Sequence, residues 1–143
     1  MAELRAVSYH EAGHCVTALT IGCPVHAIAI APCCGEQRLG ELTVTFSKNK
    51  VRAATEATMV TLAGSIAQLK ACPGSLRGED VDLEIAYDAA TYLASNPQSF
   101  IELMRFRTNK LIERRWRSVE VIAAALLRRG NLTGQEIETL VRF

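Results

Sequence analysis

The sequence of 143 residues has no long apolar run and no excess of charge of one sign. Residues 119–127 form one of its longest apolar stretches, which is far shorter than the about 20 residues that a membrane-spanning helix needs. The 16 basic and 15 acidic side chains leave a formal charge of +1, so we expect neither nucleic acid nor a membrane among its partners. Because residues 1–5 also lack the basic and apolar regions of a secretion signal, the sequence predicts a soluble cytoplasmic protein.

The five cysteines are odd in number and include no Cys-x-x-Cys pair. This usage indicates neither a disulfide framework nor a zinc ribbon. The adjacent residues Cys33 and Cys34 are the one unusual feature. We interpret them as two small residues in a loop of a protein from a reducing compartment, with metal binding or redox sensing as the alternative.

The length is that of one compact domain, residues 1–143, which would bury about 68% of the surface of its unfolded chain. Hydrophobic periodicity and breaking residues predict a mainly α (α+β) fold with one small sheet or hairpin. The expected helices cover residues 3–20 and 51–71, a stretch ending near 95, a long stretch from 98 to 129 that bends midway, and a short segment after 133. The expected strands cover residues 25–31 and 39–46, separated by a break at 32–35.

Three local signals refine this assignment. Gly13 lies inside the first expected helix and costs about 1 kcal/mol relative to Ala. We expect that another segment packs too close there for a methyl group, with simple tolerance of the glycine as the alternative. Gly22 follows the same helix and predicts its end. Thr133 and Glu136 have the spacing of a capping box, which predicts the start of the last helix.

Residues 10–14 read His-Glu-Ala-Gly-His, the H-E-x-x-H pattern, within the first expected helix. On a helix, His10 and His14 fall on one face, about 5–6 Å apart at Cβ, and can converge on one metal ion. Glu11 is turned about a quarter of a circle away, toward a water on the metal. The pattern therefore predicts a Zn²⁺ site with His10 and His14 as ligands and Glu11 as the catalytic base. The alternative is a chance match on a surface helix, with both histidines in solvent.

A catalytic zinc ion usually has three protein ligands and one water, so a further donor is needed. His26 is the only other histidine, and a half-buried or surface position in an expected strand is the simpler interpretation of it. The acidic residues of the segment after the second long helix offer oxygen ligands instead: Glu79, Asp80, Asp82 and Glu84. The spacing by itself does not choose among them.

The segment from Tyr9 to His14 resembles the zinc motif of the FtsH family, the peptidase part of the membrane-bound AAA proteases. The similarity continues in order along most of the chain, through residues 25–32, 39–40, 62–67, 82–86 and 125–137. Asp82 matches the acidic residue that is the third zinc ligand of that family. The resemblance therefore implies a helical, zincin-like metallopeptidase domain that hydrolyses peptide bonds at a zinc ion bound by His10, His14 and Asp82.

The sequence also departs from that family. No G-x-x-x-x-G-K-[ST] phosphate loop occurs in it, so we expect no ATPase module. Ser65 stands where Arg is common, Val81 stands where Asn is usual, and the connection between residues 95 and 98 is short. We therefore expect a free-standing peptidase that acts on unfolded or short peptides. The resemblance leaves open a separate ATPase partner and a homo-oligomer.

Two other classes of function compete with peptide hydrolysis. Cys33 and Cys34 could join the two histidines of the motif in a closed, structural zinc site, although Glu11 would then have no task. The chain could also be a catalytically inactive interaction module that docks on a partner ATPase or another protein. The basic stretch 105–117 could form a docking or nucleic-acid surface, but we interpret it as a solvated helix face.

Overall fold

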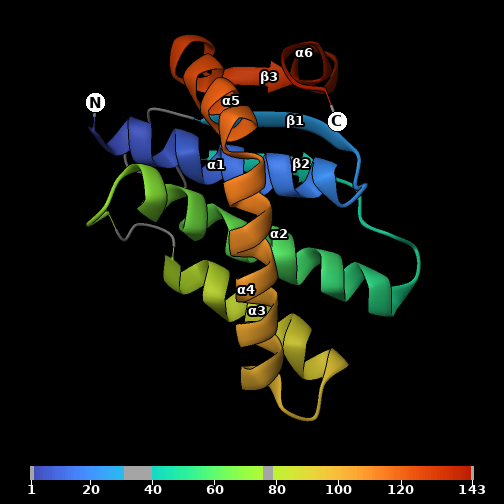
Figure 1. Ribbon diagram of the computed structural model, residues 1–143. Helices are drawn as coiled ribbons and strands as arrows, with labels where there is room; N and C mark the ends of the chain where they lie inside the picture. Colours follow the sequence, from blue (N-terminus) through green and yellow to red (C-terminus); the bar gives the residue numbers. More distant parts are fainter. Residues whose placement is uncertain (1, 31–39, 76–78, 143) are drawn as a thin grey trace.

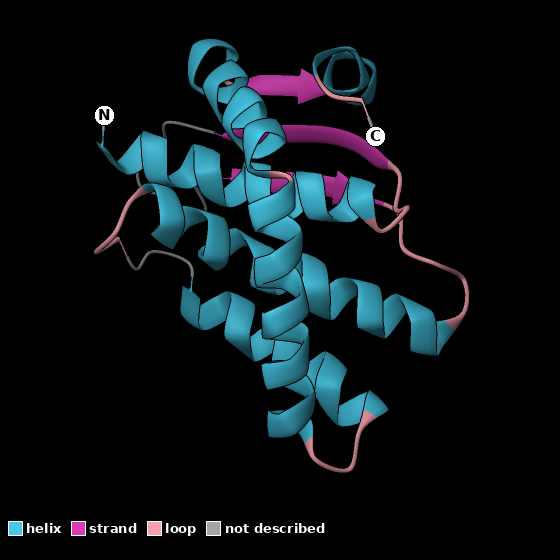
Figure 2. Ribbon diagram, in the orientation of Figure 1, coloured by secondary structure: helices cyan, strands magenta, loops and turns pink. Residues whose placement is uncertain are grey.

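The computed structural model describes residues 2–30, 40–75 and 79–142 (Figure 1). In these residues the chain forms six helices and three strands, which confirms the predicted mainly helical fold with one small sheet (Figure 2). In chain order the elements are α1 (Ala2–Thr20), β1 (Val25–Ile30), β2 (Gly40–Val44), α2 (Lys50–Ala71), α3 (Glu79–Leu93), α4 (Pro97–Arg114), α5 (Trp116–Arg129), β3 (Asn131–Thr133) and α6 (Gly134–Leu140). None of the helices in these ranges combines the length and the apolar content that crossing a bilayer requires.

The strands form an antiparallel sheet in the order β2-β1-β3. Ile28, in the middle of β1, lies opposite Leu42 of β2 and Leu132 of β3. Strand β3 is missing from the sequence prediction, because three residues between two helices are too short to show an alternating pattern. Its pairing with β1 turns the expected hairpin into a three-stranded sheet.

Helix α1 is the centre of the fold. Residues 6–13 and 15–18 are all buried, because α2, α5 and β1 pack around the helix. The polar side chains of this helix are therefore buried with the apolar ones, among them His10 and Glu11. Burying such groups is costly unless they have partners, so a chance match on a solvated surface helix does not describe this motif.

Helix α3 is held against α2 and α4 by a second, smaller core. This core contains Leu62 of α2, Ala86 and Ala90 of α3, and Ile101 and Met104 of α4. Asp82 lies one helical turn before Ala86 and two before Ala90, so it is on the face of α3 that meets this core.

Helices α4 and α5 replace the single bent helix expected over residues 98–129, and the break falls at Arg115. The two helices follow one another across α1 and α2 on the same side of the molecule (Figure 1). At the break, Trp116 stacks on Tyr9 of α1 with the ring centroids 5.6 Å apart, and the Lys70 ammonium lies 5.1 Å from the Trp116 ring centroid. These contacts position the turn of α1 that carries His10.

The helix ends follow the local signals of the sequence. Gly22, after α1, has a φ of +89°, a conformation that other residues rarely adopt. The Thr133 side chain accepts a hydrogen bond from the Glu136 backbone N–H, and Glu136 accepts one from the Thr133 N–H, which confirms the capping box of α6. The hydrogen bond from Thr133 is the largest of the causes that lower the pKa of Glu136.

Gly13 lies where α1 packs closely against α2. A Cβ atom at this position would lie 2.5 Å from the Ala63 carbonyl oxygen and 2.6 Å from the Ala67 Cβ. The first of these is a backbone atom inside a helix, which cannot move aside without displacing α2. The expectation that close packing excludes a methyl group here is confirmed.

We expect Gly13→Ala to lower the free energy of unfolding by about 1–3 kcal/mol, the usual cost of an overpacked core. In an open helix the same change would instead stabilise by about 1 kcal/mol. Urea denaturation followed by circular dichroism measures the difference. A variant as stable as the wild type would show that α1 and α2 do not need this close approach.

Candidate metal centre

His10 and His14 lie one turn apart on α1 and face the same point. Their ring centroids are 4.6 Å apart and the ring planes are nearly perpendicular, at 86°. The side chains are 10% and 12% exposed. The helical spacing therefore brings two largely buried imidazoles together, as the sequence predicts.

Both rings are held at Nδ1 by groups of α2. His10 Nδ1 lies 2.8 Å from Gln68 Oε1, and His14 Nδ1 lies 2.6 Å from the Val60 carbonyl oxygen. A histidine that binds a metal commonly donates its other ring N–H to such an oxygen, which fixes the ring and its tautomer. Here this arrangement leaves the Nε2 atoms of both rings for a common ligand.

Asp82 of α3 faces these two nitrogens. Its Oδ2 lies 2.8 Å from His10 Nε2 and 3.6 Å from His14 Nε2. The same oxygen is buried, and the polar atoms that the structure places beside it are these two ring nitrogens. Two ligands of a tetrahedral ion bound at about 2.0–2.1 Å would be about 3.3 Å apart, which is between the two observed separations. A buried carboxylate oxygen in this position suits a metal ion.

Glu11 completes the group. Potential ligand atoms of His10, Glu11 and His14 all lie within 4.8 Å of one another, so these three residues could hold a metal ion. Glu11 is 7% exposed and lies against the first residue of β2, since a Cβ on Gly40 would be 2.5 Å from Glu11 Oε1. The carboxylate is therefore placed between the two histidines and the β2 end of the sheet.

Gly64 of α2 forms the wall opposite the rings. A Cβ on Gly64 would lie 2.6 Å from the Nε2 atoms of both His10 and His14, and 2.4 Å from His14 Cε1. Only a residue without a side chain leaves the rings where they are. The space that this glycine leaves open adjoins the same two nitrogens that face Asp82.

Electrostatics favour positive charge at this point. Burial lowers the pKa of His10, but the hydrogen bond and negative charge of Asp82, the charge of Glu11 and the hydrogen bond to Gln68 together raise it above its ordinary value. The nearby thiol of Cys15 behaves differently, because burial raises its pKa to about 12. Two carboxylates therefore face two imidazoles, without a thiolate from Cys15.

The other residues considered as ligands are placed elsewhere or lie outside the described ranges. His26 is exposed on β1, with Nε2 2.6 Å from Thr45 Oγ1, and Glu84 is exposed on α3. The side chains of Glu79 and Asp80 and the pair Cys33 and Cys34 are outside the described part of the structure. Among the described acids considered, the structure brings Asp82 to the histidines.

Sequence reasoning missed the two α2 groups that hold the rings. Gln68 and the Val60 carbonyl belong to no motif, and a backbone carbonyl inside a helix gives no signal in a sequence. The burial of Gln68, which shows that its amide needs a partner, is a property of the tertiary structure and is not visible in the sequence.

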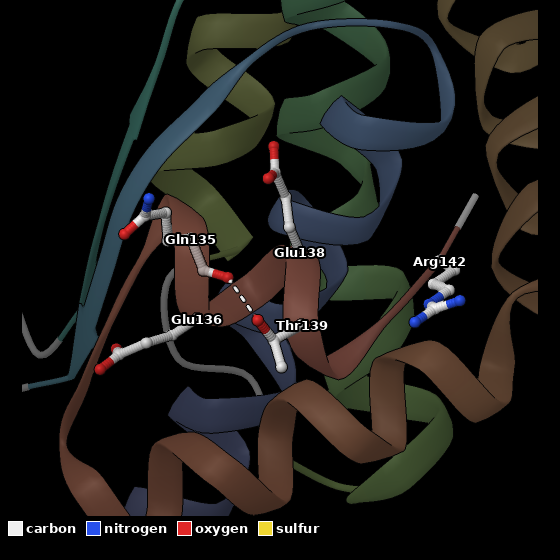
Figure 3. Close-up of a pocket in the computed structure, with 5 residues that line it drawn as sticks. All are labelled: Gln135, Glu136, Glu138, Thr139 and Arg142. Carbon is white, nitrogen blue, oxygen red and sulfur yellow. Dashed lines mark hydrogen bonds between the residues drawn. The ribbon is translucent and has the colours of Figure 1, made fainter.

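A surface depression on α6 is unrelated to this centre (Figure 3). It is lined by Gln135, Glu136, Glu138, Thr139 and Arg142. Its side chains diverge, and the interaction drawn among them is the hydrogen bond that Thr139 donates to the Gln135 carbonyl, at 3.0 Å. The depression contains none of the four residues of the candidate metal centre.

Comparison with known proteins adds no assignment. No family model matches the chain, and no curated protein matches it significantly.

Replacing Asp82 with Ala should sharply lower the metal content of the protein, because it removes a carboxylate oxygen that faces both Nε2 atoms. The control is Asp88→Ala, which removes an exposed carboxylate from the same helix. Elemental analysis after incubation with zinc and gel filtration gives the metal content per chain. Equal metal content in the two variants would exclude Asp82 as a ligand.

Gly64→Ala should weaken metal binding at least about 10-fold, because the added methyl group would push the two histidine rings out of position. Loss of a group that orients a metal ligand typically lowers the metal affinity by at least this factor. Its clashes are with the ends of side chains, so we expect a smaller loss of stability than for Gly13→Ala. A competition titration with a chromophoric chelator measures the affinity. An unchanged affinity for the metal would show that the rings lie farther from Gly64 than the 2.4–2.6 Å from a Cβ atom that the structure gives.

Proposed function

We propose that this protein is a zinc-dependent metallopeptidase that hydrolyses peptide bonds of unfolded or short peptide substrates. In this proposal His10, His14 and Asp82 hold the zinc ion, and Glu11 is the catalytic base. The observation that carries it is the convergence of two ring nitrogens and one buried carboxylate oxygen beside a second carboxylate. The resemblance to the FtsH family supports the same assignment.

The donor set suits a catalytic zinc rather than a structural one. Two neutral imidazoles and one carboxylate are three ligands, which is the number that catalytic zinc sites use while keeping one position for water. When bound, zinc supplies Lewis acidity that polarises a carbonyl and lowers the pKa of water. A closed structural site would need a fourth protein ligand and would give Glu11 no task.

Glu11 has the position of a general base. One oxygen of its carboxylate lies within 4.8 Å of a ligand atom of each histidine. Glu11 nevertheless projects from α1 in a different direction from the two histidines, because it follows His10 directly in the helix. In the proposed reaction Glu11 takes a proton from the attacking water at a carboxylate oxygen. It then delivers this proton to the leaving nitrogen of the peptide bond.

Strand β2 offers a place for an extended peptide. It is at the edge of the sheet, and in the described ranges it pairs with β1 alone. Its first residue, Gly40, lies against Glu11. Extended peptides commonly bind by adding a strand to such an edge. A substrate bound along β2 would therefore pass beside the proposed catalytic base.

The proposal extends to the partners that the resemblance implies. An ATPase on a separate chain could deliver unfolded substrate, and a homo-oligomer could enclose the sites. A catalytically inactive zinc-binding module that docks on such a partner is the alternative function. The buried carboxylate of Glu11 beside the ligand atoms favours hydrolysis over this alternative.

Glu11→Gln should reduce peptide cleavage by about 10²–10⁴-fold, because the amide cannot take up the proton. The metal content and the melting temperature should stay near those of the wild type, since the shape of the side chain is kept. Cleavage of casein, an unstructured protein, is measured with zinc-loaded protein. The matched control Glu113→Gln, at an exposed position of α4, should cleave like the wild type.

The outcomes separate the two functions. Cleavage by the wild type that Glu11→Gln retains in full would refute the role of Glu11. A wild type that binds zinc but cleaves neither casein nor short peptides, with or without added ATPase, would favour the inactive module.

A further inference from the structure

We propose that Gln68 is a positioning residue that fixes the tautomer of His10 through a directional chain of hydrogen bonds beginning at the C-terminal turn of α2. The inference rests on the proposed function in taking His10 as a zinc ligand. It goes beyond that proposal by assigning a role to a buried amide outside the ligand set and the H-E-x-x-H motif.

The chain of hydrogen bonds contains four groups in a row. Ser75 Oγ lies 2.9 Å from the Cys72 carbonyl oxygen, and Gln68 Nε2 lies 2.9 Å from Ser75 Oγ. Gln68 Oε1 lies 2.8 Å from His10 Nδ1. Gln68 is only 2% exposed, so water does not compete for its amide.

The direction of this chain follows from its first group. A carbonyl oxygen can only accept, so the Ser75 hydroxyl must donate its single hydrogen to Cys72. Ser75 Oγ can then only accept a further hydrogen bond. The group of Gln68 that faces it must therefore be the amide nitrogen, which donates. The Gln68 carbonyl oxygen consequently faces His10, and His10 Nδ1 must carry the hydrogen that it accepts.

The consequence falls on the opposite side of the ring. With a hydrogen of His10 held at Nδ1, Nε2 is the ring nitrogen left for a metal ion, on the side that faces Asp82 and His14. This is the tautomer that can bind a metal at Nε2. A reversed amide would donate to Nδ1 and place the hydrogen on Nε2, where it would block the metal.

The two histidines are therefore held by different means. His14 Nδ1 faces the Val60 backbone carbonyl, which is an acceptor whatever the side chains are. His10 Nδ1 faces the side-chain amide of Gln68, which has an accepting oxygen and a donating nitrogen. A third residue must therefore determine which of these two atoms faces the ring. Ser75 supplies this setting, and it lies in the turn that follows α2.

The test compares four variants in their affinity for zinc, measured by chelator competition. Gln68→Met keeps the volume but removes the acceptor, and it should weaken binding about 10–100-fold, the usual cost of losing such a partner. Gln68→Glu restores an acceptor and should bind zinc at least as tightly as the wild type. Ser75→Ala frees the amide to reverse and should give a smaller loss than Gln68→Met. Gln135→Met, at an exposed position of α6, is the control.

A second measurement separates positioning from packing. In the zinc-loaded protein, ¹⁵N-resolved NMR of His10 should show a hydrogen on Nδ1 in the wild type and in Gln68→Glu. A mixture or loss of this signal is expected in Gln68→Met. If Gln68 only fills space, Gln68→Met would lower the melting temperature of the metal-free protein and leave both the zinc affinity and the signal unchanged. That result would overturn the inference.

The two proposals fail in different ways. A protein that binds zinc but cleaves no peptide would refute the proposed function and leave the role of Gln68 standing. Unchanged zinc affinity in Gln68→Met would refute the role of Gln68 and leave the proposed function standing. A wild type that binds no zinc would refute both before any variant is compared.

Discussion

The close contact between α1 and α2 is the constraint on which the rest of the structure depends. Gly13 of α1 lies against the Ala63 carbonyl and Ala67, and Gly64 of α2 lies against the two histidine rings. A methyl group at either position would enter space that the other helix occupies. The two glycines therefore set how near the helices come, one from each side. Gly13 directly precedes His14 in α1, and Gly64 adjoins both histidine rings from α2.

The contact decides the chemistry that the candidate centre can support. At this separation, Gln68 and the Val60 carbonyl of α2 lie beside the Nδ1 atoms of the two rings. Helix α3 brings Asp82 to the Nε2 atoms. Helix α3 takes its own position from the small core that it shares with α2 and α4. One packing arrangement thus orients the rings, supplies the carboxylate and buries the group from water.

Much of the fold could be predicted from the sequence because its signals are local. The helices have periodic apolar positions and end at residues such as Gly22, and the Thr133 and Glu136 pair indicates the start of α6. Strand β3 was missed because its three residues form a strand only by pairing with β1. The break at Arg115 could be expected but not located, since the Trp116 stack on Tyr9 that accompanies it joins distant segments.

The sequence by itself determined that His10 and His14 share a helix face, with Glu11 beside them, because a helix repeats the same geometry wherever it forms. The spacing of the sequence did not determine which acidic residue is the third metal ligand. Only the resemblance to a known family indicated Asp82. The burial of the motif, the approach of Asp82 and the support from Val60 and Gln68 were decided by tertiary structure. These last two groups are 46 and 58 residues from the rings that they hold, and only the packing of helices fixes distances between segments so far apart in the chain.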